Sequence, residues 1–394
     1  MLNVKYILLT GLFIFCLQVV HAKPYIPSDN TQVLEKLPSG SKNLNSTKIR
    51  KLLTELRSNP KDIKETISFA KNCIELARSE SDPRYLGYAE AVLKPMLKKN
   101  NPEIFVLYAT IKQSNHSFNE ALSILDDALK IDPANEQAWL TKAQILTTLG
   151  KYPEAKQSCL HLLTKSNQLV SIACISSAAS LNGSADKSYK LLEQITDTLK
   201  NTPVSNNEKL WAHVLLSEIA ARKGNKVNAK RHYKDALSLN PNDNYLLASY
   251  SDFLLDENKP GEIINLLKDK TKSDSLFLRL IIAEKKMNIP NFESHINELK
   301  TRFLENSKRG ENIHEREEAI FNLDILNNPA VALELAQKNW EKQKEPIDTR
   351  IFLRSAIAAN KKNTTKRVIE FINQTMIEDI YINDLAEEIK GISK

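Results

Sequence analysis

Apolar residues recur at helical spacing along most of the chain from Thr47 onward. Ile49, Leu52, Leu53 and Leu56 fall at i, i+3, i+4 and i+7, which places them on one face of a helix. The same spacing continues towards the C-terminus, interrupted mainly by prolines and short polar stretches. No stretch of useful length alternates as a strand does. The pattern therefore predicts an all-α protein with short loops.

The apolar pattern of the last third of the chain predicts a further series of amphipathic helices, and Pro290, Pro329 and Pro346 lie at some of their boundaries. Proline suits the start of a helix, where its missing N–H removes no intrahelical hydrogen bond. The expected helices are 275–287, 291–304, 315–326, 330–343, 347–360, 364–376 and 380–392. Residues 305–314 lose the apolar pattern, so we expect a loop there.

The sequence repeats with a period of 34 residues. Segments 102–135 and 136–169 align without a gap, and a third copy occupies 210–243. The copies share small residues, such as Ala121 and Ala155, where paired helices would touch. They also share an aromatic residue after the turn and a proline that closes the unit. A fixed period of this length is typical of a helical repeat array.

These shared residues resemble the tetratricopeptide repeat family. The match is strong over 102–168, good over 210–243, and weak over 169–202 and 244–277. The resemblance implies antiparallel helix pairs stacked into a right-handed superhelical solenoid, with irregular repeats towards the C-terminus. It also implies a binding scaffold with no chemistry of its own. The wider chain is similar to exported bacterial proteins of this family.

Glycine usage agrees with a helical solenoid. The chain contains 9 glycines in 394 residues, whereas an average composition of about 7% would give roughly 28. So few glycines cannot supply the tight turns and phosphate-binding loops of large sandwiches, barrels or nucleotide-binding folds. Gly150, Gly183 and Gly224 fall at equivalent turns of successive units.

The first residues have the pattern of a secretory signal peptide. Lys5 precedes an apolar run that ends near Val20, and Val20-His21-Ala22 loosely fits a small-x-small cleavage site. An uncleaved membrane anchor is the alternative, but the run is short for a span of about 20 residues. We expect cleavage after Ala22 and a periplasmic or secreted chain with no transmembrane segment.

The pattern divides the chain into five parts. They are a signal peptide over 1–22, an extended or disordered lead-in over 23–46, N-terminal helical repeats over 47–101, a tetratricopeptide array over 102–277, and degenerate repeats with a C-terminal cap over 278–394. Because each solenoid repeat contacts only its neighbours, these helical parts can form one continuous stack.

Charge argues against nucleic acid as a partner. The chain has 55 basic and 48 acidic residues, a formal net charge of +7, and the two signs are interleaved. Nucleic-acid binding needs a concentrated basic stripe, and none is present.

The sequence contains no recognisable catalytic or metal-binding motif. No two histidines lie at i and i+4, no Cys-x-x-Cys occurs, and the nucleophile, phosphate-loop and dinucleotide motifs are missing. We therefore expect no enzyme activity, no metal site and no cofactor. A pocket with converging carboxylates in 275–394 would instead favour an enzyme.

The cysteines suggest one disulfide. Cys159 and Cys174 lie at similar distances on either side of an expected turn near 165–168, so antiparallel helices would bring them side by side. Two reduced, buried cysteines are the alternative. Cys73 is left over, and we expect it to be buried in a helix.

In this family the first helix of each pair lines the concave face. In this sequence, the expected outward positions of those helices are mostly uncharged and polar: Thr110, Gln113, Thr141, Gln144, Thr148, Ser177, Glu218 and Arg222. Most of these side chains both donate and accept hydrogen bonds, which suits an extended polypeptide. We expect a nearly neutral groove that binds a protein or peptide in the bacterial cell envelope. A scaffolding or regulatory partner of an enzyme that acts on cell wall or exported polysaccharide is the alternative.

Overall fold

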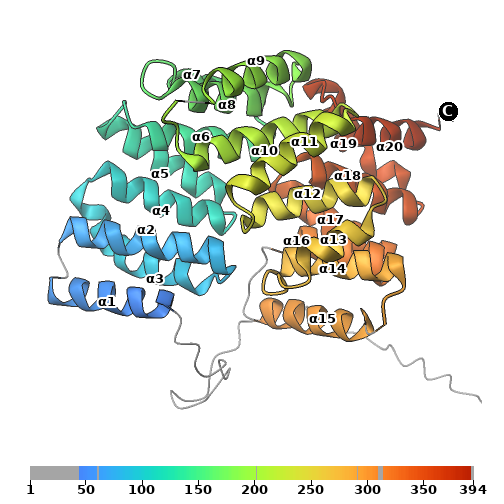
Figure 1. The fold of residues 1–394 in the computed structure, drawn as a ribbon, viewed down its shortest axis with the longest axis horizontal. Helices are drawn as coiled ribbons and strands as arrows, with labels where there is room; N and C mark the ends of the chain where they lie inside the picture. The colour runs from blue at the N-terminus through green and yellow to red at the C-terminus, as the bar shows by residue number, and fades with distance from the viewer. Residues whose placement is uncertain (1–43, 60–61, 201, 291, 309–313, 392–394) are drawn as a thin grey trace, which may run out of the picture.

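The computed structural model describes residues 44–59, 62–200, 202–290, 292–308 and 314–391, and these form a continuous stack of helices (Figure 1). The predicted signal peptide and nearly all of the predicted lead-in lie outside the described residues. The first helix begins at Leu44, three residues before the expected start of the repeats at Thr47. Among the described residues, no helix is both long and apolar enough to span a membrane.

The helices have the following bounds. The N-terminal part contains α1 (Leu44–Ser58), α2 (Ile63–Glu80), α3 (Arg84–Leu93) and a 3-10 segment η1 (Lys94–Lys99). The middle contains α4 (Pro102–Ser114), α5 (Phe118–Ile131), α6 (Glu136–Thr148), α7 (Tyr152–Leu160), α8 (Gln168–Ala179), α9 (Ala185–Thr198), α10 (Asn206–Arg222), α11 (Lys226–Leu239), α12 (Asn244–Asp256) and α13 (Pro260–Leu267). The C-terminal part contains α14 (Asp274–Met287), α15 (Phe292–Lys308), α16 (Glu315–Ile320), a π-helical turn η2 (Phe321–Ile325), α17 (Pro329–Lys342), α18 (Pro346–Ala358), a 3-10 turn η3 (Lys362–Thr365), α19 (Lys366–Thr375) and α20 (Ile380–Lys390).

Local sequence explains where these helices begin and end. Asn101, Asn135 and Asp243 precede α4, α6 and α12, and each side chain accepts a hydrogen bond from a backbone N–H of the first helical turn. The turn after α6 contains Gly150 with φ +73°, and the turn after α10 contains Gly224 with φ +75°. Glycine adopts this left-handed conformation without the steric cost that a Cβ atom imposes.

Consecutive helices pack as antiparallel pairs, and the pairs stack into a right-handed superhelix. The pairs include α4 with α5, α6 with α7, α8 with α9 and α10 with α11. Segment 169–202, whose sequence matches the repeat poorly, nevertheless forms the regular pair α8 and α9. The all-α solenoid predicted from periodicity is confirmed.

The superhelix closes on itself at one edge. The Asn244 side-chain amide, at the start of α12, donates to the backbone oxygen of Arg78 at 2.8 Å and lies 2.9 Å from the Ser81 hydroxyl. Lys272 adds an ion pair with Glu80 at 3.3 Å. These contacts join the start of α12 and the turn between α13 and α14 to the α2–α3 turn, more than 160 residues earlier in the sequence.

The C-terminal helices pack against the turns of the repeat array. The Lys344 N–H donates to the oxygen of Thr148 at 2.7 Å, and the Asn182 amide donates to the oxygen of Thr375 at 2.8 Å. Glu378 accepts from the N–H of Ala185, also at 2.8 Å. The degenerate repeats therefore pack along the side of the array and also cap its end.

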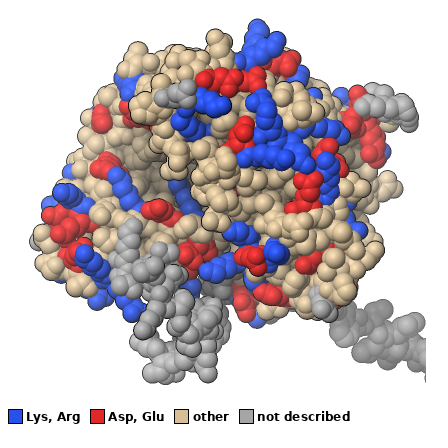
Figure 2. Space-filling model, in the orientation of Figure 1, with Lys and Arg blue, Asp and Glu red and all other residues tan. Residues whose placement is uncertain are grey.

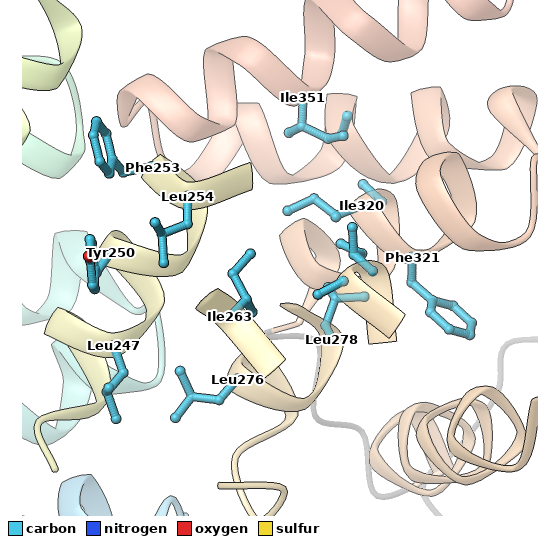
Figure 3. Packing of buried hydrophobic residues seen from close by; sticks show 14 of the residues in the cluster. Leu247, Tyr250, Phe253, Leu254, Ile263, Leu276, Leu278, Ile320, Phe321 and Ile351 are labelled. Carbon is cyan, nitrogen blue, oxygen red and sulfur yellow. The ribbon is translucent and has the colours of Figure 1, made fainter. Parts of the chain in front are cut away.

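The largest apolar core runs through the C-terminal half and includes side chains of the middle turns. Leu254, Ile263 and Leu278 point towards one another from α12, α13 and α14 (Figure 3). The same cluster contains Tyr152 and Leu181 from the array and Ile377 from the C-terminal segment. Smaller clusters serve the N-terminal pairs, as expected where each repeat packs on its neighbours.

Two helix boundaries differ from the sequence predictions. A loop was expected over 305–314, but α15 continues to Lys308. Asn306 is buried in this extension, and its side-chain amide donates to Asp274 of α14. The expected helix 315–326 changes into the π-helical turn at Phe321. Residues 309–313 lie outside the described residues.

Candidate functional site

A cavity of about 1330 Å³ lies inside the curve of the superhelix. First helices of four pairs, α4, α6, α10 and α12, line it together with α2. We call this cavity the groove. Figure 2 shows the surface hollowed between the N-terminal helices and α10–α12.

Carboxamide side chains are the main polar feature of the groove. They are Asn101, Asn135, Gln137, Gln144, Asn207, Asn240, Asn242 and Asn244. Several also cap helices, which explains why they gather at the start of the lining helices. Each carboxamide offers two donors and an acceptor, so the groove can hydrogen-bond both N–H and C=O groups.

Apolar and aromatic side chains provide the rest of the lining. Val106, Leu210, Trp211 and Val214 come from α4 and α10. Tyr245 is 63% exposed, although its hydroxyl donates to Glu218 at 2.8 Å. The groove thus combines hydrogen-bonding groups with surfaces that can cover an apolar side chain.

The charged lining residues are Lys71, Arg78, Glu75, Glu103, Asp132 and Asp243. Lys71 and Glu103 form an ion pair at 2.5 Å. Burial lowers the pKa of Arg78, while the nearby Asp243 carboxylate opposes that shift. With two basic and four acidic groups, the lining is weakly acidic, close to the nearly neutral groove expected from sequence.

The structure distributes the eight predicted groove residues between several environments. Thr110 and Gln144 line the groove, and Gln144 is exposed. Thr141 is buried and its hydroxyl lies 3.1 Å from the Gln137 amide. Gln113 and Ser177 are half-buried and do not line the cavity.

The remaining three predicted residues take part in internal contacts. Thr148 is buried beneath the segment that contains Lys344. Arg222 donates to the Ser180 hydroxyl at 2.9 Å, and Glu218 accepts from Tyr245 and Ser249. Burial raises the pKa of Glu218. The sequence could not indicate these contacts, because helix position alone does not show which outward faces another segment covers.

A second cavity, of about 560 Å³, lies among α12, α14, η2 and α18. Three carboxylates line it, and each pairs with an arginine: Asp252 with Arg279 at 2.6 Å, Asp256 with Arg350 at 2.6 Å, and Asp324 with Arg354 at 2.5 Å. Burial raises the pKa of Asp256, against the lowering effect of Arg350. A general acid–base pair needs carboxylates free to exchange protons with a substrate, and these three are held by cations. The cavity therefore gives no support to the enzyme alternative.

Sequence spacing missed one cluster of potential metal ligands. His213 of α10 and His232 of α11 place their Nδ1 atoms 3.3 Å apart, beside Asp235. The two histidines are 19 positions apart in the sequence, so a search for i, i+4 pairs does not find them. Their proximity follows from the antiparallel packing of α10 and α11.

Cys159 of α7 and Cys174 of α8 are joined by a disulfide, with their Cα atoms 5.5 Å apart. The antiparallel turn between the helices brings them together, as the spacing suggested. Cys73 is a free cysteine and is buried in α2. Burial raises the pKa of its thiol to about 12.

Comparisons with known proteins agree with this architecture. A tetratricopeptide repeat family model matches residues 114–168, and another matches residues 212–243. No curated protein matches the sequence significantly. The chain therefore contains tetratricopeptide repeats in these two segments, and such repeats form protein- and peptide-binding scaffolds.

Similar solved structures are distant in sequence. A tetratricopeptide repeat protein from Parabacteroides merdae is 13% identical, with a TM-score of 0.39 over 73% of this chain and 98% of that one. YrrB, described as a TPR protein with an unusual peptide-binding site, is 14% identical, with a TM-score of 0.30 over 53% of this chain and 99% of that one. Human IFIT1, solved as a dimer with PPP-AAAA, is 14% identical, with a TM-score of 0.43 over 88% of this chain and 78% of that one. At these scores the similarities say nothing about a ligand.

Proposed function

We propose that this protein is a non-catalytic scaffold in the bacterial cell envelope, and that its groove binds an extended segment of a partner polypeptide. The carboxamide lining of the groove is the observation that carries the proposal. The cavity of about 1330 Å³ exceeds the roughly 300–1,000 Å³ of ordinary small-molecule sites. Solenoids commonly bind through their extended concave surfaces.

The lining chemistry favours an extended backbone as the ligand. An extended peptide presents N–H and C=O groups that must find partners when water is displaced. Gln144 and Asn207 are exposed in the groove and can supply both kinds of partner. Trp211 and Tyr245 offer ring faces to an apolar side chain, and such aromatic residues often dominate binding energy.

Charge narrows the class of segment. The lining carries two more acidic than basic side chains. A neutral or mildly basic segment would therefore meet less repulsion than an acidic one. The effect should be modest, because the excess is only two charges over the whole lining.

Two features support an extracytoplasmic location. The apolar run and small-x-small site at residues 1–22 have the form of a secretory signal. Disulfides persist mainly in oxidising compartments, and Cys159 and Cys174 are bridged. Cleavage would be tested by N-terminal sequencing of the mature protein, with Lys23 expected as its first residue.

Affinity capture from envelope extract tests the binding proposal. The test variant carries Gln144→Ala and Asn207→Ala, since both side chains are exposed in the groove. The matched control is Gln157→Ala, which removes an exposed glutamine of α7 that does not line the groove. We expect the groove variant to lose captured protein and the control to retain it. Equal capture by all three proteins would refute groove binding.

A further inference from the structure

We propose that His213, His232 and Asp235 form a binding site for one divalent transition-metal ion of the Zn²⁺ type. His213 comes from α10, and His232 and Asp235 come from α11. The His213 and His232 Nδ1 atoms are 3.3 Å apart, and Asp235 Oδ2 lies 3.8 Å and 3.9 Å from them. Imidazole nitrogen and carboxylate oxygen are ligands that Zn²⁺ commonly takes in proteins.

The three atoms have the correct separation for a shared ion. A triangle with sides of 3.3, 3.8 and 3.9 Å has a circumscribed circle of radius about 2.1 Å. A point at that distance from all three atoms therefore exists. Zinc bonds to histidine nitrogen and carboxylate oxygen are about 2.0–2.2 Å long, so an ion could bind without a large movement of the ligands.

The surroundings can orient one of the ligands. When Nδ1 of His232 binds a metal, its ring proton must reside on Nε2, because Nδ1 then offers its lone pair. That Nε2 atom lies 3.0 Å from the Tyr189 hydroxyl, which in turn donates to Glu193 at 2.8 Å. Such a hydrogen bond from the far nitrogen of a ligating histidine is a common support of metal sites.

The hydrogen bond between Arg231 and His232 should change when an ion binds. Its Nη2 atom lies 3.1 Å from His232 Nε2 and 2.6 Å from Glu193. Without metal, Nε2 can accept from Arg231 while Nδ1–H of His232 donates to His213. Metal binding moves the His232 proton from Nδ1 to Nε2, and Arg231 keeps its shorter ion pair with Glu193.

An ion can reach the site from solvent. His232 is nearly fully buried, whereas the side chains of His213 and Asp235 are 19% and 45% exposed. An ion with these three protein ligands would retain an open position for water or for a group from a partner. The site lies between the repeat helices α10 and α11, apart from the polar lining of the groove.

Equilibrium dialysis of the full chain against ZnCl₂, without an affinity tag, tests the proposal. We expect one Zn²⁺ per chain in wild type, at least tenfold weaker binding in His213→Gln and Asp235→Asn, and unchanged binding in His161→Gln. His161 is an exposed histidine that stacks on Trp139 and serves as the matched control. Far-UV circular dichroism would verify that each variant is folded.

Thermal unfolding of the same proteins gives an independent measurement. An ion that binds only the folded chain stabilises it, and the stabilisation grows with the logarithm of the ion's excess over Kd. Zn²⁺ should therefore raise the melting temperature of wild type and His161→Gln, and EDTA should reverse the shift. Absence of saturable binding by wild type, or equal binding by folded His213→Gln and Asp235→Asn, would overturn the proposal.

Discussion

Gly150→Ala probes the contact between the repeat array and the C-terminal helices. Gly150 has φ +73°, and a Cβ atom built there would lie 2.6 Å from Cε2 and 2.8 Å from Cζ of Phe371. The Phe371 ring cannot move freely, because it lies between Tyr152 and Trp340, at centroid distances of 6.2 Å and 5.6 Å. Alanine would therefore strain the backbone and overlap with a packed ring.

Two costs add at this position. A left-handed conformation costs an L-residue about 1–2 kcal/mol, and overpacking of a well-packed site costs about 1–3 kcal/mol. We expect Gly150→Ala to lower the free energy of unfolding by about 2–5 kcal/mol. Gly183→Ala is the matched control, because Gly183 has φ +67° but its Cβ would lie 3.4 Å from the nearest atom, on Met376. Gly183→Ala should lower the free energy of unfolding only by the cost of the left-handed backbone, about 1–2 kcal/mol.

Urea unfolding followed by circular dichroism at 222 nm would measure the difference. A double-mutant cycle with Phe371→Ala measures the steric cost between the two side chains. Without the ring, Gly150→Ala should lower the free energy of unfolding by no more than Gly183→Ala does. Equal destabilisation by Gly150→Ala and Gly183→Ala, with no coupling to Phe371, would show that the C-terminal helices do not pack on this turn in solution.

Three further predictions concern the disulfide, acid stability and a buried ion pair. Thiol titration of the denatured, unreduced chain from residue 23 should find one thiol, that of Cys73, and three thiols would rule out the bridge. Reduction of the Cys159–Cys174 bridge should lower the free energy of unfolding by about 3 kcal/mol, given its 15-residue separation. Burial and the Arg316 charge lower the pKa of His116 to about 4, so the unfolded chain binds the proton more readily and stability should fall as pH drops from about 6.5 towards 4. His116→Asn should make stability less dependent on pH, as measured by urea midpoints across this range; asparagine tolerates the φ of +57° at this position. An unchanged pH dependence would contradict the lowered pKa of His116. Arg316→Met should cost about 3–5 kcal/mol by the same assay, because it leaves the fully buried Asp348 without the guanidinium 2.6 Å away; a loss below 1 kcal/mol would contradict that burial.

The helical architecture was predictable because its causes are local. Apolar spacing such as that from Ile49 to Leu56 fixes a buried helix face, and Pro133 and Gly150 mark ends that need no distant partner. The degenerate repeats were predictable for the same reason: Pro329 and Pro346 each occupy the first position of a helix in the structure. Periodicity thus predicts the stack even where the repeat sequence has decayed.

Contacts between distant segments were not predictable from the sequence. Nothing near Gly150 indicates Phe371, more than 200 residues later, and nothing near Thr148 indicates that Lys344 covers it. The groove lining was missed in part for the same reason, because α2 and α12 approach each other only when the superhelix closes. Asn135 caps α6 by a local hydrogen bond, but its place in the lining depends on that closure.

Photocrosslinking from the groove tests the central claim most directly. A photoreactive amino acid would replace Gln144 in the groove or Gln157 on the outer helix α7, in otherwise identical full chains in the native envelope. The account predicts crosslinks from position 144 to one continuous segment of a polypeptide, located by mass spectrometry, and none to that segment from position 157. Crosslinks of the same partner from both positions, or from position 157 alone, would contradict binding in the groove.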